Sequence, residues 1–273
     1  MNRKVIIGLP IYNEQEALPH LFRKLETLRD VLGDALHCLL VDDGSTDRSR
    51  DLLAKFTASF PHAVLLAHPE NRGLGEAMRT MIGYAAEQFG AEDILVTLDA
   101  DNTHDPAMIP AMVEKLREEG LDLVVASRFA RGGAEHGVPL VRKLYSRGAA
   151  ALLRPFFHVP GVTDYSSGFR AYRVGLLQKA SRRYQGRLIT SRGFSCMAEM
   201  MAKFSKIGVK AGEYPLVLEY GRKEGPSKMK AIRTIAEYIR LLVTVKRPPI
   251  RSEQEPPAIG GLRAAAVSGD EEP

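Results

Sequence analysis

The stretch Thr97-Leu98-Asp99-Ala100-Asp101-Asn102-Thr103-His104-Asp105-Pro106 decides the fold that we predict, because it places two carboxylates one residue apart behind an apolar run. That run, Ile94-Leu95-Val96, predicts a buried strand, and Asp99 and Asp101 would emerge at its carboxyl end. Paired carboxylates suit Mg²⁺ or Mn²⁺, which proteins commonly share with substrate phosphates. Taken alone, the pair leaves both a cation site and a polar turn open.

Strands and helices alternate on both sides of this stretch. Such alternation predicts an α/β fold with a mostly parallel central sheet and helices on both of its faces. The predicted strands are Val5–Leu9, Cys38–Val41, Val64–Ala67, Ile94–Leu98 and Leu121–Ala126. The predicted helices are Gln15–Leu32, one that begins at Asp47 and covers Phe56, one through Met78–Ala85, and Pro106–Glu119.

Polar residues follow every predicted strand. In open α/β sheets ligands bind outside the carboxyl ends of the strands, so five such ends on one edge predict a binding site. The residues concerned are Asn13-Glu14, Asp42-Asp43, Asn71, Asp99 with Asp101, and Ser127-Arg128.

After Arg128 the pattern is looser. We expect an apolar helical stretch over 139–157, a tight loop at 164–170 entering a short strand, a helix over Phe194–Ser205, a strand through Val209 and a basic loop at 222–228. Residues 229–246 are predicted to be an amphipathic helix that either packs on the domain or lies in a membrane interface. Its expected apolar face comprises Ile232, Ile235, Ala236, Ile239, Leu242 and Val243.

These segments predict three parts of the chain. Residues 1–228 would form the catalytic domain, residues 229–247 the amphipathic helix, and residues 248–273, which are rich in Pro, Gly and Ala, a disordered tail.

Charge is distributed unevenly along the 273 residues, although the whole chain has a net charge of +5. Residues 1–127 hold 12 Lys and Arg against 21 Asp and Glu, a net of −9, whereas residues 128–247 hold 24 against 7, a net of +17. The basic half predicts an anionic partner, and a phosphorylated substrate, a nucleic acid or an anionic membrane would each fit.

The sequence excludes several classes of protein. An EF-hand loop starting at Asp99 would need Gly where His104 stands and Glu where Pro110 stands. The stretch Gly73-Leu74-Gly75-Glu76-Ala77-Met78 lacks the third glycine of a dinucleotide fingerprint, and no P-loop occurs. With only Cys38 and Cys196 we expect no disulfide framework and a reducing cytosolic setting. We also expect no signal peptide and no membrane-spanning helix.

Ordered motifs give the chain a resemblance to the glycosyltransferase family 2 enzymes, and within them to the dolichol-phosphate (polyprenyl-phosphate) mannosyltransferase group. The resemblance covers about residues 4–230. Its motifs are Pro10-Ile11-Tyr12-Asn13-Glu14, Val41-Asp42-Asp43-Gly44-Ser45-Thr46-Asp47, Asn71-Arg72-Gly73-Leu74-Gly75, Leu98-Asp99-Ala100-Asp101, Ser127-Arg128-Phe129, Asp164 with Ser167-Gly168-Phe169-Arg170, and Arg222 with Gly225-Pro226-Ser227-Lys228.

The resemblance implies a GT-A-type fold and a role for each motif. Asp99 and Asp101 would hold Mg²⁺ or Mn²⁺ on the donor diphosphate and, with Arg128, form the catalytic set. The nucleotide sugar would contact Pro10, Tyr12, Glu14, Asp42, Asp43, Asn71, Gly75, Asp99, Ala100 and Asp101. The acceptor or its phosphate would contact Arg128, Arg142, Arg147, Ser167, Arg222, Ser227 and Lys228.

The implied reaction is the inverting transfer of mannose from GDP-mannose to polyprenyl phosphate at the cytoplasmic face of a membrane. An acceptor phosphate is already an anionic nucleophile, so positioning and charge compensation matter more than a general base. The chain departs from the group at Thr103, where some members have a metal-binding Gln, and in lacking membrane helices, which leaves room for a separate anchoring protein.

Two alternatives stay open at this point. In the first, an enzyme of the same family uses a UDP-sugar as donor, or a soluble, lipid or protein acceptor. In the second, the chain is not an enzyme, and its basic half binds nucleotides or nucleic acids. Single residues have structural interpretations as well: Asp47 as a helix cap, His104 as support for the carboxylate loop, Glu213 as a solvated strand end, and Arg170 with Glu199 as an internal ion pair.

Overall fold

The computed structural model describes residues 3–139, 147–148, 151–219, 221 and 231–245. Its centre is a seven-stranded sheet with the order β3-β2-β1-β4-β7-β5-β8. All neighbouring strands are parallel except for β7, which runs antiparallel to both β4 and β5. The predicted α/β fold with a mostly parallel sheet is confirmed. The strands are β1 (Val5–Ile11), β2 (Leu36–Asp42), β3 (Ala63–Ala67), β4 (Ile94–Thr97), β5 (Leu123–Ser127), β7 (Arg170–Arg173) and β8 (Ala211–Pro215).

Helices cover both faces of the sheet, because successive side chains of a strand point to opposite faces and both sets are apolar. In β1, Ile6 joins one core while Val5, Ile7 and Leu9 join the other. The first core lies under α3 (Leu74–Gln88), α6 (Val174–Tyr184) and α7 (Cys196–Ser205). The second lies under α1 (Leu18–Leu32), α2 (Ser49–Ser59) and α4 (Ile109–Glu118), with short 3₁₀ turns at Gly33–Ala35 and Pro106–Met108.

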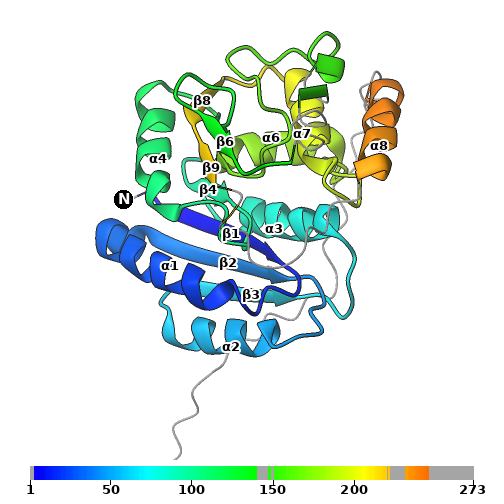
Figure 1. The fold of residues 1–273 in the computed structure, drawn as a ribbon. Coiled ribbons are helices and arrows are strands. Elements are labelled where there is room, and N and C mark those ends of the chain that lie inside the picture. The colour runs from blue at the N-terminus through cyan, green and yellow to red at the C-terminus, as the bar shows by residue number, and fades with distance from the viewer. Residues whose placement is uncertain (1–2, 140–146, 149–150, 220, 222–230, 246–273) are drawn as a thin grey trace, which may run out of the picture.

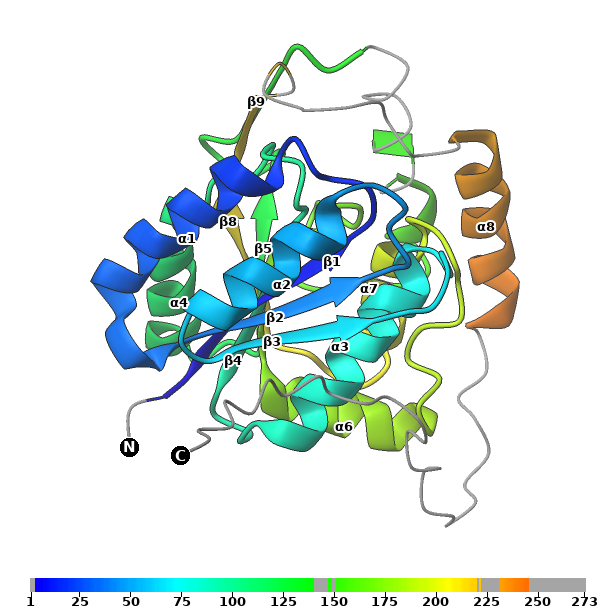
Figure 2. The same cartoon turned by 90° about the horizontal axis from the view of Figure 1, so that it is seen from below.

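The carboxyl ends of the parallel strands share one edge, as predicted. The arrowheads of β1, β2 and β3 point the same way in Figures 1 and 2. Two elements were not anticipated, namely α6 and a small parallel ribbon of β6 (Ala134–His136) with β9 (Val217–Glu219). The strand predicted through Val209 is wrong in its start, because β8 begins at Ala211.

The C-terminal helix α8 (Ala231–Thr244) lies beside α7, on the side toward which β1, β2 and β3 point (Figures 1 and 2). Among its described side chains, Tyr238 and Leu241 pack inward, together with Val245 just after the helix. Ile239 and Val243, by contrast, are 54% and 74% exposed. Of the two alternatives for this helix, packing on the domain therefore leaves these two residues of the expected apolar face uncovered. No helix in the described part of the chain is long and apolar enough to cross a membrane.

Candidate active site

The loops after β1 and β2 are clasped together by hydrogen bonds between side chains and backbone. Asn13, whose φ of 51° lies in the left-handed region, donates its N–H to Ser45 Oγ (3.0 Å) and accepts the Thr46 N–H on its Oδ1 (2.8 Å). The Glu14 N–H donates to Ser49 Oγ (2.8 Å). These bonds bring the first two motifs together, with Pro10, Tyr12 and Glu14 partly exposed beside them.

Asp47 belongs to the same clasp. Its Oδ1 accepts the Ser49 N–H at the start of α2 (2.9 Å), and its Oδ2 accepts the Gln15 N–H (3.2 Å). Asp47 thus binds the first N–H of α2 from one residue before the N-cap, which is Arg48 and makes no side-chain capping bond. Burial is the largest single influence on the pKa of the Asp47 carboxyl and would raise it. The hydrogen bonds from Ser49 and Gln15 together outweigh burial, so the pKa lies below its ordinary value.

Asp42 is fully buried at the end of β2. One carboxylate oxygen accepts the Ser45 N–H (2.9 Å), and the other lies 2.7 Å from Arg50 Nε. Arg50 is half exposed and also donates to the His68 carbonyl (3.0 Å). The carboxylate therefore anchors its own loop, and its contact with a nucleotide stays a prediction.

Asp43, its neighbour, holds the loop after β3. It accepts the backbone N–H groups of Arg72 (3.0 Å) and Gly73 (2.8 Å), and its Oδ1 lies 2.7 Å from Nδ1 of the buried His68. The other ring nitrogen of His68 lies 2.9 Å from Thr80 Oγ1. Asp43 thus places the predicted nucleotide contact Asn71, which is exposed two residues before Gly73.

Gly75 is a glycine because another backbone crosses it. Its N–H donates to the Arg192 carbonyl (2.9 Å), and a Cβ at this position would stand 1.8 Å from the Ser191 carbonyl oxygen. The crossing segment is held in turn by Glu199, which accepts the N–H groups of Thr190 and Ser191. A backbone carbonyl therefore occupies the amino end of α3. A bound phosphate would lie at that position if this glycine-rich turn were a phosphate-binding loop.

The loop that carries Asp99 and Asp101 is supported from several sides. Asp101 is 8% exposed and accepts both the hydroxyl (2.5 Å) and the N–H (3.2 Å) of Thr103. The Asp99 N–H donates to Nδ1 of the buried His104 (3.2 Å), so the supporting role expected of this histidine is confirmed. Asn102, at a φ of 63°, donates to the Ala17 carbonyl (3.2 Å) and ties the loop to the start of α1.

The residues of this loop fit a divalent cation that shares its ligands with a substrate. Asp99 is partly exposed, and Gly168 lies so close that an added Cβ would stand 3.2 Å from Asp99 Oδ1. No group of three His, Cys, Asp or Glu side chains in the described ranges forms a complete metal site. Mg²⁺ and Mn²⁺ commonly use one or two carboxylates and complete their shell with phosphate and water, so Asp99 and Asp101 supply a suitable donor set.

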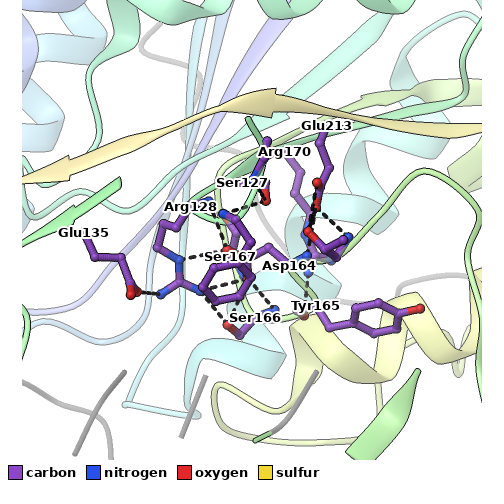
Figure 3. A network of polar contacts seen from close by, with 12 residues as sticks. Ser127, Arg128, Glu135, Asp164, Tyr165, Ser166, Ser167, Arg170 and Glu213 are labelled. Carbon is purple, nitrogen blue, oxygen red and sulfur yellow. Dashed lines mark hydrogen bonds and ion pairs between the residues drawn. The ribbon is translucent and has the colours of Figure 1, made fainter. Parts of the chain in front are cut away.

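Arg128 lies inside a network of carboxylates and hydroxyls (Figure 3). Its guanidinium makes two parallel bonds of 2.8 Å to Asp164, donates to Ser166 Oγ (2.7 Å) and lies 3.3 Å from Glu135 Oε1. Asp164 is fully buried and also accepts the Ser167 N–H (3.1 Å). The arginine therefore ties the end of β5 to the loop that carries Ser167 and Gly168 toward Asp99.

The electrostatics of this pair follow from its burial. Burial would raise the pKa of Asp164, but Arg128 and the hydrogen bonds from Ser166 outweigh it, so that pKa lies below its ordinary value. Burial likewise acts to lower the pKa of Arg128, and Asp164 and Glu135 raise it above its ordinary value.

Two structural expectations for single residues are wrong. Glu213 is no solvated strand end, because its carboxylate accepts the N–H groups of Thr163 (2.6 Å) and Asp164 (2.9 Å) and orders their loop (Figure 3). Glu199 pairs with Lys203 (2.6 Å) rather than with Arg170. A carboxylate four residues before a lysine on one helix is the pattern that predicts this pair, and proximity along α7 decides the partner.

The predicted acceptor residues are only partly described. Arg147 is exposed, and its guanidinium carbon lies 6.0 Å from the centre of the Phe129 ring. Ser167 is buried, and its Oγ has no hydrogen-bond partner within the described part of the chain. Arg142, Arg222, Ser227 and Lys228 lie outside the described residues. The sequence reasoning missed the contact of His68 with Asp43 and that of Thr163 with Glu213, which join residues 25 and 50 positions apart.

Comparison with known proteins identifies the family. Residues 6–180 match the family model of Glycosyl transferase family 2. The chain is 31% identical over 243 residues to the dolichol-phosphate mannosyltransferase of Pyrococcus furiosus, covering 87% of this chain and 62% of that protein. It is also 31% identical over 226 residues to the undecaprenyl-phosphate mannosyltransferase of Micrococcus luteus, covering 83% and 87%.

A solved structure shows the same fold. It is glucosyl-3-phosphoglycerate synthase from Mycobacterium tuberculosis in complex with Mn²⁺, UDP and glucosyl-3-phosphoglycerate, which superposes with a TM-score of 0.64 at 22% identity. The match covers 92% of this chain and 82% of that one, and it confirms the expected GT-A-type architecture. With the family model matched over residues 6–180, the chain belongs to glycosyl transferase family 2 and is a glycosyltransferase.

Proposed function

We propose that this enzyme transfers a sugar from a nucleoside diphosphate to a polyprenyl phosphate, with mannose from GDP-mannose as the preferred donor and with inversion at the anomeric carbon. The observation that carries the proposal is the carboxylate pair Asp99 and Asp101, set at the shared edge of five polar strand ends. Relatives named as polyprenyl-phosphate mannosyltransferases, which cover 83–87% of the chain, support the acceptor class.

Asp99 and Asp101 would hold Mg²⁺ or Mn²⁺, which when bound neutralises the charge of the leaving diphosphate. Asp42, Asp43 and the Asn13 clasp shape the wall against which Pro10, Tyr12, Glu14, Asn71, Gly75 and Ala100 would receive the nucleotide. The acceptor phosphate is already charged near neutral pH and needs no strong base. The residues proposed to position it are Arg142, Arg147, Ser167, Arg222, Ser227 and Lys228.

Arg128 has a different place in this proposal from that of a free phosphate ligand. Its guanidinium is bound to Asp164 and Glu135, so its contribution is to hold Ser167 and Gly168 against the carboxylate loop and to keep one positive charge near the reacting phosphates. Bidentate arginine–carboxylate bonds fix geometry in a way that lysine does not, and this suits a positioning role.

The outer side of α8 supports contact with a membrane that carries the lipid acceptor. Ile239 and Val243 are exposed there, with the exposed Arg240 beside them. A helix with apolar and basic residues on its outer side binds at the interface of anionic membranes. We propose peripheral attachment at the cytoplasmic face through this surface, alone or with an anchoring protein.

A donor screen with a polyprenyl-phosphate acceptor tests the proposal. Purified protein with Mg²⁺ or Mn²⁺ is incubated with GDP-mannose, UDP-glucose and other nucleotide sugars, and products are scored by mass. We expect polyprenyl phosphate mannose from GDP-mannose, and product formation slower by on the order of 10²–10³ in the Asp101→Asn variant. Failure with every donor, in protein that binds nucleotide, would overturn the acceptor class.

A UDP-sugar donor is the second candidate. Thr103 stands where some members of the group have a metal-binding Gln, and here its hydroxyl is bonded to Asp101. The 31% identical undecaprenyl-phosphate 4-deoxy-4-formamido-L-arabinose transferase of Salmonella paratyphi B shows that relatives differ in the sugar their names specify. Product from UDP-glucose alone in the same screen would favour this alternative.

A further inference from the structure

The amino end of α3 packs against a backbone segment that precedes α7. The Arg192 carbonyl accepts the Gly75 N–H (2.9 Å), and a Cβ on Gly73, whose φ is 94°, would stand 2.5 Å from the same oxygen. The Gly73 N–H is in turn held by Asp43 (2.8 Å). Because the two glycines leave no room for Arg192 to shift toward them, the turn and the segment keep one relative position.

Helix α8 contacts the same segment just beyond Arg192. Glu237 Oε2 accepts the hydroxyl of the fully buried Ser195 (2.5 Å), and a Cβ on Gly193 would stand 3.5 Å from that carboxylate oxygen. The next residue of α8, Tyr238, packs into the core that contains α7. Contacts with α8 therefore begin one residue after the carbonyl that meets α3.

The start of α7 explains why a carboxylate suits this place. Ser195 is the N-cap residue of α7, yet its side chain makes no capping bond to that helix. A serine at this position commonly accepts a backbone N–H of the first turn, whereas here its hydroxyl donates to Glu237. The amino end of a helix carries partial positive charge, which favours a carboxylate beside it. Glu237 therefore fits this place by its charge as well as by its hydrogen bond.

The other side-chain supports of this segment act on its earlier residues. Glu199 accepts the N–H groups of Thr190 (2.9 Å) and Ser191 (2.8 Å). For residues 192–195, the described part of the chain provides one side-chain hydrogen bond, the one between Ser195 and α8. Loss of that bond would leave the residues between Ser191 and α7 with backbone hydrogen bonds alone.

We propose that Glu237 is a positioning residue of the donor site. Through Ser195 it fixes the backbone at Arg192, and that backbone sets the turn at Gly73 and Gly75 against which the nucleotide is proposed to bind. The proposal rests on the proposed function only in taking this turn as part of the nucleotide wall. In this role Glu237 touches no substrate, so its loss weakens donor binding and leaves the chemical step nearly unchanged.

Substitutions at both ends of the hydrogen bond test this role. Binding of GDP and of UDP is measured by titration calorimetry with Mn²⁺, and donor KM and kcat are measured by steady-state kinetics. We expect Glu237→Ala and Ser195→Ala each to raise the nucleotide Kd and the donor KM about 3- to 10-fold, with kcat within about 2-fold of the wild type. Glu237→Gln keeps an acceptor for the Ser195 hydroxyl, so its Kd should stay within about 2-fold. The double variant should bind no more weakly than either single variant, because both substitutions remove the same bond.

Glu114→Ala is the matched control, since it makes the same change at an exposed position of α4, and we expect wild-type values from it. An unchanged nucleotide Kd in Glu237→Ala and Ser195→Ala, or additive losses in the double variant, would overturn the proposal. If Glu237→Ala does not fold, Ser195→Ala, which removes a single hydroxyl, decides the outcome. Because nucleotide binding needs no acceptor, absence of sugar transfer to polyprenyl phosphate would contradict the proposed function alone.

Discussion

The acidic and the basic halves of this chain use their charges in different ways. In the acidic half the motif carboxylates act first on backbone: Asp42 accepts an N–H of its own loop, and Asp43 and Asp47 accept N–H groups of neighbouring loops. In the basic half the buried cations act on carboxylates, with Arg128 on Asp164 and Lys203 on Glu199. One half thus builds a rigid wall from acceptors, and the other tightens loops with ion pairs.

The largest loss of activity is expected from a substitution in the acidic half, in the loop that carries Asp99 and Asp101. Asp101→Asn removes a charge from the proposed cation site, and we expect kcat to fall by on the order of 10²–10³ because diphosphate departure loses its electrostatic support. The control is Asp105→Asn, at the residue whose Oδ1 accepts the Ala107 N–H at a 3₁₀ turn (3.1 Å). Equal loss in both variants would place the effect in the loop's structure rather than in the charge.

Breaking the ion pair of the basic half should affect stability most. Asp164→Asn leaves Arg128 partly uncompensated in a buried network, and we expect the free energy of unfolding to fall by about 3 kcal/mol, measured by urea denaturation. A loss below about 1 kcal/mol would show that Glu135 and Ser166 compensate the guanidinium by themselves.

The same pair predicts a pH dependence. The pKa of Asp164 is lowered in the folded protein from an ordinary value of 3.8, so the folded state binds fewer protons there than the unfolded state. Its stabilising contribution is fully present from about pH 5 upward, and it is lost as the pH falls through 3.8 toward the lower pKa of the folded state. Unfolding free energies at pH 5 and pH 3 should therefore differ less in Asp164→Asn than in the wild type, and an unchanged difference would contradict this.

Gly75, in the acidic half, packs against the backbone of Ser191 and Arg192 in the basic half. Gly75→Ala would push a methyl group into the Ser191 carbonyl oxygen, at 1.8 Å, and we expect a loss of about 2–3 kcal/mol together with weaker nucleotide binding. Gly148→Ala is the matched control, since a Cβ there meets no atom of the described residues within 4 Å. Calorimetric unfolding with and without GDP measures both effects, and equal stability of the two variants would refute the packing explanation.

The smallest effect is expected at the clasp of the acidic half. Asn13→Ala removes the acceptor of the Thr46 N–H, and we expect a loss of about 1 kcal/mol and a rise in donor KM with kcat nearly unchanged. Steady-state kinetics with varied donor concentration separate the two parameters. A fall in kcat alone would mean that the clasp acts on the carboxylate loop instead of the nucleotide wall.

Much of the fold and of the site's location followed from local pattern. Apolar runs placed the first five strands to within two residues, and the polar residues after them predicted the edge that the structure places them on. Asp47 as a cap and His104 as a loop support were among the expected roles because their partners lie two and five residues away. Glu213 was misread because its partners, Thr163 and Asp164, lie about 50 residues earlier in the chain.

By itself, the sequence determined the alternation of strands and helices, the acidic edge and the charge asymmetry, since each depends on the order of neighbouring residues. Only the tertiary structure decided that β7 enters the sheet antiparallel, that Arg128 faces Asp164, and that a distant backbone crosses Gly75. The physical reason is distance along the chain. Hydrophobic periodicity reports which face of an element is buried, but a buried charge takes its partner from whichever segment the packed core brings to it.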